Sequence, residues 1–227
     1  MEAISEVIGL LFGPNDELRQ IIWVTLRMSL VSTTLAAAIG IPLGVILGCM
    51  RFPGHGIIMR ITTTLMGLPP VVAGLVVFLI LSNSGPLGSM QLLYTVTAMV
   101  IAQIVLITPI IAGLTANTVG ARYNQVSETV RGLGLSSPMS FCYTLYECRH
   151  QMVAVLLTGF GRAISEVGAV QIVGGNIQFR TRVMTTSIMM ATNMGRFNFA
   201  IALGVVLLII AFAVNGLAHF FSKEKDL

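Results

Sequence analysis

Residues 28–50 read MSLVSTTLAAAIGIPLGVILGCM, a stretch without one charged side chain between Arg27 and Arg51. A helix needs about 20 apolar residues to cross the hydrocarbon core of a bilayer, and this stretch is long enough. A buried helix of a water-soluble domain rarely needs so many uncharged residues in a row. The stretch therefore predicts a membrane-spanning helix and decides the fold class.

The composition of the whole chain agrees with this interpretation. Of its 227 residues, 55% are hydrophobic and 10% are charged, whereas soluble domains carry about 25% charged residues. Two further stretches lack charge, one between Arg60 and Arg122 and one between Arg196 and Lys223. The chain is therefore expected to be an all-α integral membrane protein in contact with lipid, with a single transmembrane domain over residues 1–227.

We expect five transmembrane helices, because a turn-forming cluster at residues 82–88 divides the longest charge-free stretch into two spans. More arginines and lysines fall on the side that holds the polar loop 120–151 and the C-terminus than on the other side. This bias favours a cytoplasmic C-terminus and an N-terminus outside. The predicted spans cover residues 28–50, 61–82, 92–117, 152–174 and 197–221.

Small residues recur at every fourth position of the first span. Such a stripe lets two helix backbones approach closely in lipid, where close packing drives association. The pattern leaves open whether the neighbouring helix belongs to the same subunit. The stripe consists of Ser32, Ala36, Gly40, Gly44 and Gly48.

Prolines lie deep in the second and third spans, at Pro69, Pro70 and Pro109. A proline inside a helix removes a backbone donor and kinks or opens the helix, which is tolerated in a membrane only against protein or a water-filled path. Pro69 and Pro70 are therefore candidates for a pathway or gate. A packing kink without a role in transport is the alternative.

Several classes of function are disfavoured by what the sequence lacks. The lysines are Lys223 and Lys225, so no phosphate-binding loop ending in Gly-Lys-Ser or Gly-Lys-Thr is present. Glu166 is the one acid inside a predicted span, which argues against the acidic proton relay of a secondary carrier. We expect no catalytic residues, no metal, no cofactor and no nucleic-acid partner.

The loop 120–151 is the most polar part of the chain. Its apolar residues follow helical spacing from Val126 onwards, and Gly134 stands where a left-handed helix cap is expected. Ser137 can cap a second helix. The pattern predicts two surface helices joined by a turn, suited to docking another protein, with an ordinary connecting loop as the alternative. The residues expected to dock are Glu128, Val130, Leu133 and Gly134.

Three segments carry a resemblance to a known family. Residues 128–134, ETVRGLG, resemble the Glu-Ala-Ala-x-x-x-Gly loop of importer-type ABC transporter permeases, with Glu128 and Gly134 matching and the two alanines replaced. Residues 161–169, GRAISEVGA, are similar to a segment of molybdate, sulfate and tungstate permeases. Residues 67–75, GLPPVVAGL, and 84–88, SGPLG, are most like tungstate permeases.

The resemblance implies a type I, molybdate-permease-like ABC permease in a bacterial or archaeal cell membrane. Such a subunit passes an oxyanion, here most of all tungstate, from an extracytoplasmic binding protein into the cytoplasm. It implies a homodimer with two copies of a separate ATPase subunit that docks on the loop 120–151. A molybdate or sulfate permease is the alternative within the family, and an ATP-independent carrier or channel is the more distant alternative.

Arg162 and Glu166 are the strongly charged residues placed inside a predicted span. Residues four apart share one face of a helix, so the two side chains are expected to pair. A structural ion pair and a gating element are both consistent with this spacing, because ionisable groups in the bilayer face protein or water. Ser165 adds a hydroxyl that could donate to an oxyanion.

Overall fold

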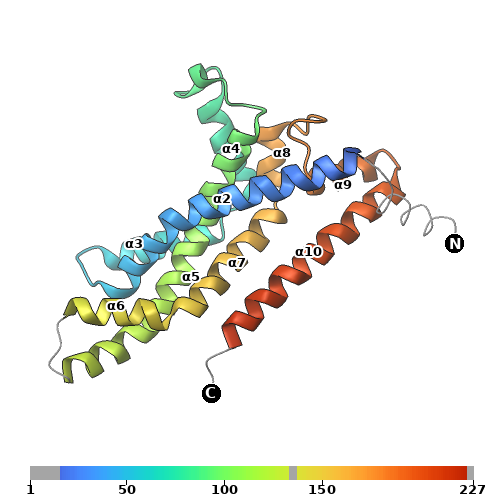
Figure 1. Ribbon diagram of the computed structural model, residues 1–227. Helices are drawn as coiled ribbons and strands as arrows, with labels where there is room; N and C mark the ends of the chain where they lie inside the picture. The colour runs from blue at the N-terminus through green and yellow to red at the C-terminus, as the bar shows by residue number, and fades with distance from the viewer. Residues whose placement is uncertain (1–15, 133–136, 224–227) are drawn as a thin grey trace. The chain divides into compact units, whose positions relative to one another are not determined.

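The computed structural model describes residues 16–132 and 137–223, which form α-helices, one 3₁₀ turn and the loops between them and contain no β-strand (Figure 1). This confirms the all-α fold class. The helices are α2 (Asp16–Cys49), α3 (His55–Met66), α4 (Pro70–Leu81), α5 (Val96–Gly132), α6 (Ser137–Glu147), α7 (Arg149–Ile164), α8 (Gly168–Gly174), α9 (Met184–Asn193) and α10 (Phe197–Lys223), and the 3₁₀ turn η1 covers Gly88–Met90.

Among the described helices, α2, α5 and α10 are each long and apolar enough to cross a membrane. Two further pairs, α3 with α4 and α7 with α8, meet the same criterion together, and each pair is bent at a short break. If each bent pair forms one span, the described chain has five spans, which is the number predicted.

The observed helices extend beyond the predicted spans. α2 begins at Asp16 instead of near residue 28, and α5 continues to Gly132 instead of ending near residue 117. Hydropathy marks where the bilayer ends, whereas helix-forming residues such as Ala, Arg and Gln continue a helix into the polar region. As a result, the first helix predicted for the loop 120–151 is the end of α5. The ten-residue α9 was not predicted.

The described helices form two compact units. The first unit comprises residues 16–32, 69–104 and 161–213, and the second comprises residues 33–68, 105–132, 137–160 and 214–223. Long helices such as α2 and α5 contribute residues to both. A single transmembrane domain over residues 1–227 stays a prediction, and each unit is described by itself.

In the second unit, the small-residue stripe of α2 packs against α5. A Cβ atom added at Gly48 would lie 2.8 Å from the Ala116 carbonyl oxygen, and one added at Gly40 would lie 3.0 Å from Cγ2 of Ile111. A Cβ at Gly44 would likewise collide with the backbone of Ala112. The stripe therefore serves helix packing, and the neighbour is a helix of the same chain.

The core of the second unit anchors the junction between α6 and α7. Val45 of α2, Val119 of α5 and Cys148 at the junction are buried together. Leu145 of α6 and Met152 of α7 pack against this cluster. The second helix of the loop 120–151 is thus held against α2 and α5 by apolar contacts at its C-terminal end.

In the first unit, α2 and α9 are joined by a buried hydroxyl. Thr25 Oγ1 donates to the Ile21 carbonyl oxygen over 2.7 Å and accepts a hydrogen bond from the backbone N–H of Met184 over 2.9 Å. The Met184 N–H is in the first turn of α9 and has no partner within that helix. Thr25 therefore fixes the start of α9 on α2.

Candidate translocation and coupling sites

The chain breaks between α3 and α4 at the Gly67–Leu68–Pro69 segment, where the sequence predicts an opened helix. Pro69 is extended, with φ −60° and ψ 126°, because the ring of Pro70 disfavours the α conformation of the preceding residue. Pro70 then begins α4, where its missing N–H costs no hydrogen bond. Pro109, by contrast, lies inside α5, which stays helical on both sides of it, so this proline opens no helix.

A second break separates α7, which ends at Ile164, from α8, which begins at Gly168. Glu166 lies in this break and its side chain is only 5% exposed. Its Oε1 accepts a hydrogen bond from the backbone N–H of Ala169 over 3.1 Å, and its carbonyl oxygen accepts one from the Thr185 hydroxyl over 2.8 Å. The N–H groups of a first helical turn lack intrahelical partners, so Glu166 caps α8 and ties it to α9.

The predicted pairing of Arg162 with Glu166 is wrong. The ion pair found among the described residues joins Arg182 to Glu17, and neither Arg162 nor Glu166 takes part in it. The spacing i, i+4 brings side chains together only on a continuous helix, and α7 ends two residues before Glu166. Arg162 is instead exposed.

Ser165 lies in the same break and is exposed. Its hydroxyl lies 3.0 Å from the Gly161 carbonyl oxygen and 3.2 Å from that of Arg162, and donates to the end of α7. In this arrangement the hydroxyl proton is engaged by the chain itself. A role of Ser165 as an anion ligand stays a prediction.

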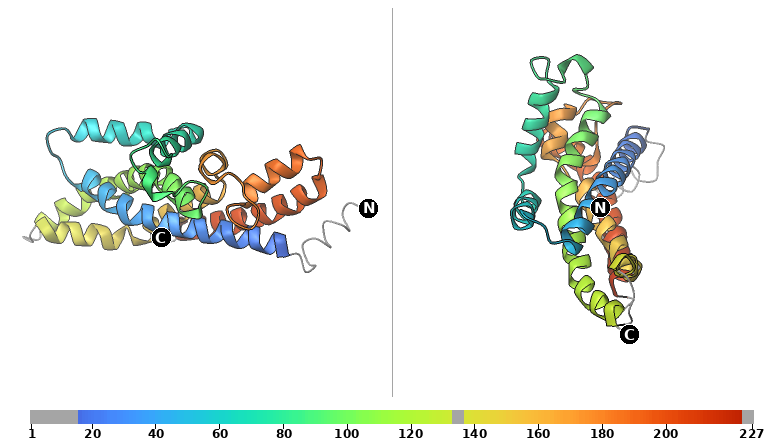
Figure 2. Two further views of the ribbon diagram at one scale, coloured as in Figure 1. Left: turned by 90° about the horizontal axis from the view of Figure 1, so that it is seen from above. Right: turned by 90° about the vertical axis from the view of Figure 1, so that its left-hand side faces the viewer.

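The short helices that follow the two breaks, α4 and α8, pack against each other (Figures 1 and 2). A Cβ added at Gly74 of α4 would lie 2.6 Å from Cα of Ala169 in α8. A Cβ added at Gly168 would lie 2.9 Å from Cγ2 of Val71 and 3.7 Å from Cβ of Pro70. The structure therefore brings Pro70 close to the start of α8. The predicted spans 61–82 and 152–174 thus meet where both contain candidate residues for the pathway.

Gln103 of α5 is completely buried beside the second break. Its Nε2 donates to the Ala163 carbonyl oxygen over 2.8 Å, and its Oε1 accepts a hydrogen bond from the Ser32 hydroxyl over 2.5 Å. Ala163 lies in the last turn of α7, where carbonyl groups have no intrahelical partner, and its oxygen also accepts the N–H of Glu166 in the break over 3.3 Å. Gln103 thus links α2, α5 and the end of α7. A single glutamine in an apolar helix has no motif, and sequence reasoning missed it.

Replacing this glutamine is expected to destabilise the first unit. Gln103→Leu removes two buried hydrogen bonds, one to the Ala163 carbonyl and one from the Ser32 hydroxyl, and each contributes about 0.5–1.5 kcal/mol. The midpoint of thermal unfolding of the detergent-solubilised chain should fall, whereas Gln125→Leu, at an exposed position of the same helix, should leave it nearly unchanged. Equal midpoints for the two variants would contradict this role of Gln103.

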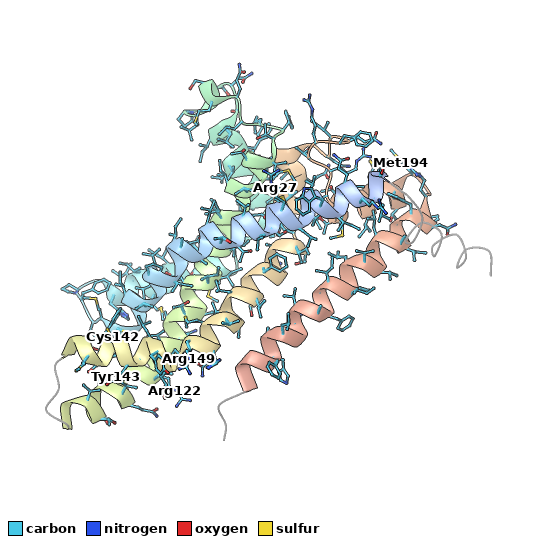
Figure 3. All side chains as sticks on the ribbon, viewed as in Figure 1. Arg27, Arg122, Cys142, Tyr143, Arg149 and Met194 are labelled. Carbon is cyan, nitrogen blue, oxygen red and sulfur yellow. The ribbon has the colours of Figure 1, made fainter. Side chains whose placement is uncertain are left out.

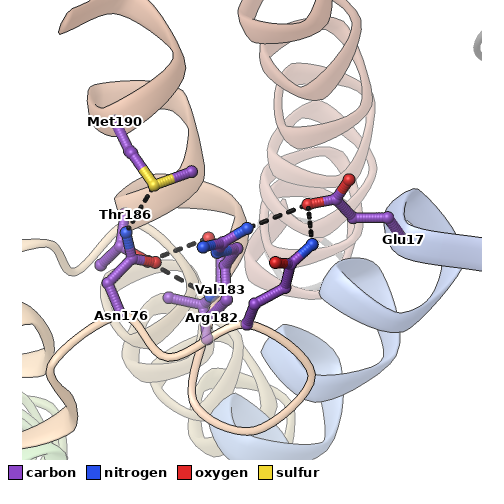
Figure 4. A network of polar contacts seen from close by, with 7 residues as sticks. Glu17, Asn176, Arg182, Val183, Thr186 and Met190 are labelled. Carbon is purple, nitrogen blue, oxygen red and sulfur yellow. Dashed lines mark hydrogen bonds and ion pairs between the residues drawn. The ribbon is translucent and has the colours of Figure 1, made fainter. Parts of the chain in front are cut away.

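The loop between α8 and α9 holds a second polar network (Figure 4). Glu17 Oε1 in the first turn of α2 is 2.9 Å from Arg182 Nη1 and accepts a longer hydrogen bond of 3.2 Å from Gln178 Nε2. Within the loop, the Asn176 side chain accepts a hydrogen bond of 3.0 Å from the Thr186 hydroxyl. The network ties the loop to the start of α2. Residues so far apart in sequence carry no spacing signal, so this pairing was not predicted.

The residues predicted for docking are only partly described. Glu128 is exposed near the end of α5, whereas Val130 is 5% exposed. Leu133 and Gly134 lie outside the described residues. A buried valine packs within its own chain, so Val130 does not contribute to an exposed apolar ridge. The coupling roles of these four residues stay predictions.

α6 carries exposed aromatic residues that sequence reasoning passed over (Figure 3). Tyr143 is 51% exposed and Tyr146 is 67% exposed, and the guanidinium of Arg149 lies 4.1 Å from the ring centre of Tyr146. Exposed Phe141 and Met139 lie on the same helix. Tyr and Arg are frequent anchors of protein interfaces. The repeated aromatics of this polar loop were the signal that could have pointed to α6.

Comparison with known proteins places these features in a family. A family model described as "Binding-protein-dependent transport system inner membrane component" matches residues 40–226. The tungstate uptake system permease protein TupB of Peptoclostridium acidaminophilum is 41% identical to this chain, over 99% of this chain and 100% of the relative. TupB of Campylobacter jejuni is 36% identical, over 96% of this chain and 91% of the relative.

A sulfate permease is less similar. The sulfate transport system permease protein CysW of Escherichia coli K12 is 27% identical, over 74% of this chain and 60% of the relative. The family match begins within α2 and includes both breaks, the loop 120–151 and α10. The chain therefore belongs to the family of binding-protein-dependent transport system inner membrane components.

Proposed function

We propose that this chain is the membrane permease subunit of an ATP-driven importer that passes tungstate from an extracytoplasmic binding protein into the cytoplasm. The observation that carries this proposal is the 41% identity to a tungstate uptake permease over nearly the full length of both chains. A sulfate permease is only 27% identical over three quarters of the chain. Sulfate and molybdate therefore remain the weaker alternatives within the same class.

The energy for transport comes from a partner in this proposal. The sequence contains no phosphate-binding loop, so ATP is hydrolysed on a separate subunit. The exposed aromatic face of α6 and exposed Glu128 of α5 form the surface that this ATPase would contact. Five spans are few for a complete pathway, so two copies of the chain would form the pore at a two-fold interface and carry two ATPase subunits.

The two breaks are the proposed moving parts of the pathway. Glu166 Oε1 accepts a hydrogen bond at the start of α8, so its side chain positions that helix. Because α4 and α8 pack closely through Gly74 and Gly168, they would move together when the segments at residues 67–69 and 165–167 change conformation. Pro69, Pro70, Arg162, Ser165 and Glu166 remain the candidates for the pathway or gate.

The substrate is tested by ATP hydrolysis of the complex assembled from this permease, its ATPase and its binding protein in lipid vesicles. Binding protein loaded with tungstate is expected to stimulate hydrolysis more than the same protein loaded with molybdate or sulfate. Empty binding protein gives the baseline. Stronger stimulation by sulfate or molybdate than by tungstate would assign the importer to that anion.

The orientation is tested with Cys142 and Cys148. We propose that the N-terminus lies outside and the C-terminus in the cytoplasm, which places α6 on the cytoplasmic side. Cys142 is exposed, so a membrane-impermeant thiol reagent should label it in inverted vesicles and not in intact spheroplasts. Cys148 is fully buried and should stay unlabelled in both. Labelling of Cys142 in spheroplasts would reverse the orientation.

A further inference from the structure

α3 in the second unit has three distinct faces and no buried residue. One face contacts the rest of the unit: His55 Nε2 lies 2.8 Å from the Leu47 carbonyl oxygen, and Met66 packs over Gly113 of α5. The other two faces are exposed, one polar and one apolar. With twelve residues, α3 is too short to cross a bilayer alone, for which about 20 residues are needed.

The polar face of α3 forms the wall of an open pocket of about 620 Å³. Two arginines that line it, Arg51 and Arg60, are exposed. The hydroxyls of Thr63 and Thr64 donate to carbonyl groups one turn earlier on the same helix, so the arginines supply the free donors. The complete lining consists of Arg51, His55, Gly56, Met59, Arg60, Thr63 and Thr64.

The charge of this pocket is not neutralised by the chain around it. Residues 18–127 contain no aspartate or glutamate. Within the described residues of the second unit, neither Arg51 nor Arg60 forms an ion pair. Arginine presents a planar set of N–H donors that matches phosphate oxygens, and in this position it is available for an anion.

The second exposed face of α3 is a row of large apolar side chains next to the pocket. Ile57 is 65% exposed, Ile61 is 53% exposed and Leu65 is 38% exposed. These positions follow one another at intervals of four, so they form one stripe along the helix. A helix with a basic polar face and an adjacent apolar face is suited to the boundary between lipid headgroups and acyl chains.

We propose that the pocket on α3 binds the phosphate headgroup of an anionic phospholipid, with an acyl chain lying along Ile57, Ile61 and Leu65. The arginines match the headgroup in charge, and the apolar stripe distinguishes a lipid from a small free anion, which has no apolar part to cover it. Anionic lipids attract cations near the membrane surface, and the proposed orientation places this pocket on the cytoplasmic side. The site goes beyond the proposed transport function.

The test uses the full chain in vesicles, with Trp23→Phe to remove the one native tryptophan and Ile57→Trp as a reporter on the apolar stripe. Acyl-brominated phosphatidylglycerol is compared with acyl-brominated phosphatidylcholine as a quencher, each at the same fraction of total lipid. We expect brominated phosphatidylglycerol to quench the fluorescence of the reporter tryptophan more strongly than brominated phosphatidylcholine does. Each cation near the surface contributes about 1 kcal/mol, so Arg51→Gln and Arg60→Gln should each lower the preference severalfold.

Arg122→Gln is the matched control, because it removes one positive charge from the second unit outside the pocket. This variant should leave the preference for phosphatidylglycerol unchanged. Unchanged quenching by phosphatidylcholine shows that each variant is folded and inserted. Equal quenching by the two lipids before any arginine is replaced overturns the proposal. If Arg122→Gln lowers the preference for phosphatidylglycerol as much as Arg60→Gln does, the proposal is also overturned, because general surface charge would then cause the preference.

Millimolar tungstate or inorganic phosphate should leave the lipid preference intact, because the acyl chain adds to the affinity of the bound lipid. If either anion abolishes the preference, the pocket belongs to a free oxyanion and the lipid assignment is wrong. The measurement needs neither ATP nor transport. Its failure therefore leaves the proposed importer function untouched, and failure of tungstate uptake leaves the lipid site untouched.

Discussion

Gly74→Val is expected to reduce the yield of folded chain severalfold. A Cβ at residue 74 would lie 2.6 Å from Cα of Ala169 and 3.2 Å from the Ala169 carbonyl oxygen. Both atoms belong to the backbone, so a rotamer change cannot relieve the overlap and α8 itself has to move. Overpacking of this kind costs about 1–3 kcal/mol or more. This overpacking weakens the contact that holds α4 and α8 together.

Gly204→Val is the matched control, because Gly204 is also a helical glycine of the first unit and a Cβ there would meet no atom within 4 Å. Both substitutions introduce the same β-branched side chain, so their intrinsic helix costs are similar. The measurement is the monodisperse fraction of the detergent-solubilised chain together with its thermal midpoint. Gly74→Val behaving like Gly204→Val would show that α4 and α8 are not packed as described.

Glu166→Leu is expected to cause the second large loss, because it removes the acceptor that caps the first turn of α8. Ala169 N–H then becomes a buried donor without a partner, which costs about 1–3 kcal/mol in water-soluble proteins and more in lipid. Glu166→Gln retains a side-chain oxygen at the same place and should lose less stability. The comparison uses the thermal midpoint and the amount of complex assembled with the ATPase.

Substitution of Arg162 distinguishes the capping role of Glu166 from an ion pair between Arg162 and Glu166. Because Arg162 is exposed and α7 ends before Glu166, Arg162→Met should alter stability little. The double variant Arg162→Met/Glu166→Leu should be as unstable as Glu166→Leu alone. If the double variant regains stability, the two charges neutralise each other in the membrane, since a lone buried charge is more costly than no charge.

The main features of the fold could be predicted from the sequence because they depend on local composition. Charge-free stretches fix the spans, and the double proline at residues 69–70 fixes the first break. The spacing of Gly40, Gly44 and Gly48 predicted close helix packing, which the structure assigns to α5. The partner of a small-residue stripe is set by the fold and cannot be read from the stripe itself.

The predictions about individual side chains were less successful, for physical reasons. The spacing of Arg162 and Glu166 implies a pair only if the helix continues, and the break at residues 165–167 depends on the Ala169 N–H and on Thr185, which is distant in sequence. Gln103 acts through the Ala163 carbonyl, which accepts its side chain in the last turn of α7, where the regular helical bonding ends. Both sites depend on where helices end, and hydropathy does not specify helix ends.

The central claim is tested most directly by tungstate accumulation in vesicles that contain this permease and its ATPase, with the tungstate-loaded binding protein on the side of the permease N-terminus. ATP supplied on the ATPase side should drive accumulation, and omission of ATP, of the binding protein or of the permease should each abolish it. Tungstate accumulation by vesicles of the permease alone, without ATP, would contradict the importer function and assign the chain to ATP-independent carriers.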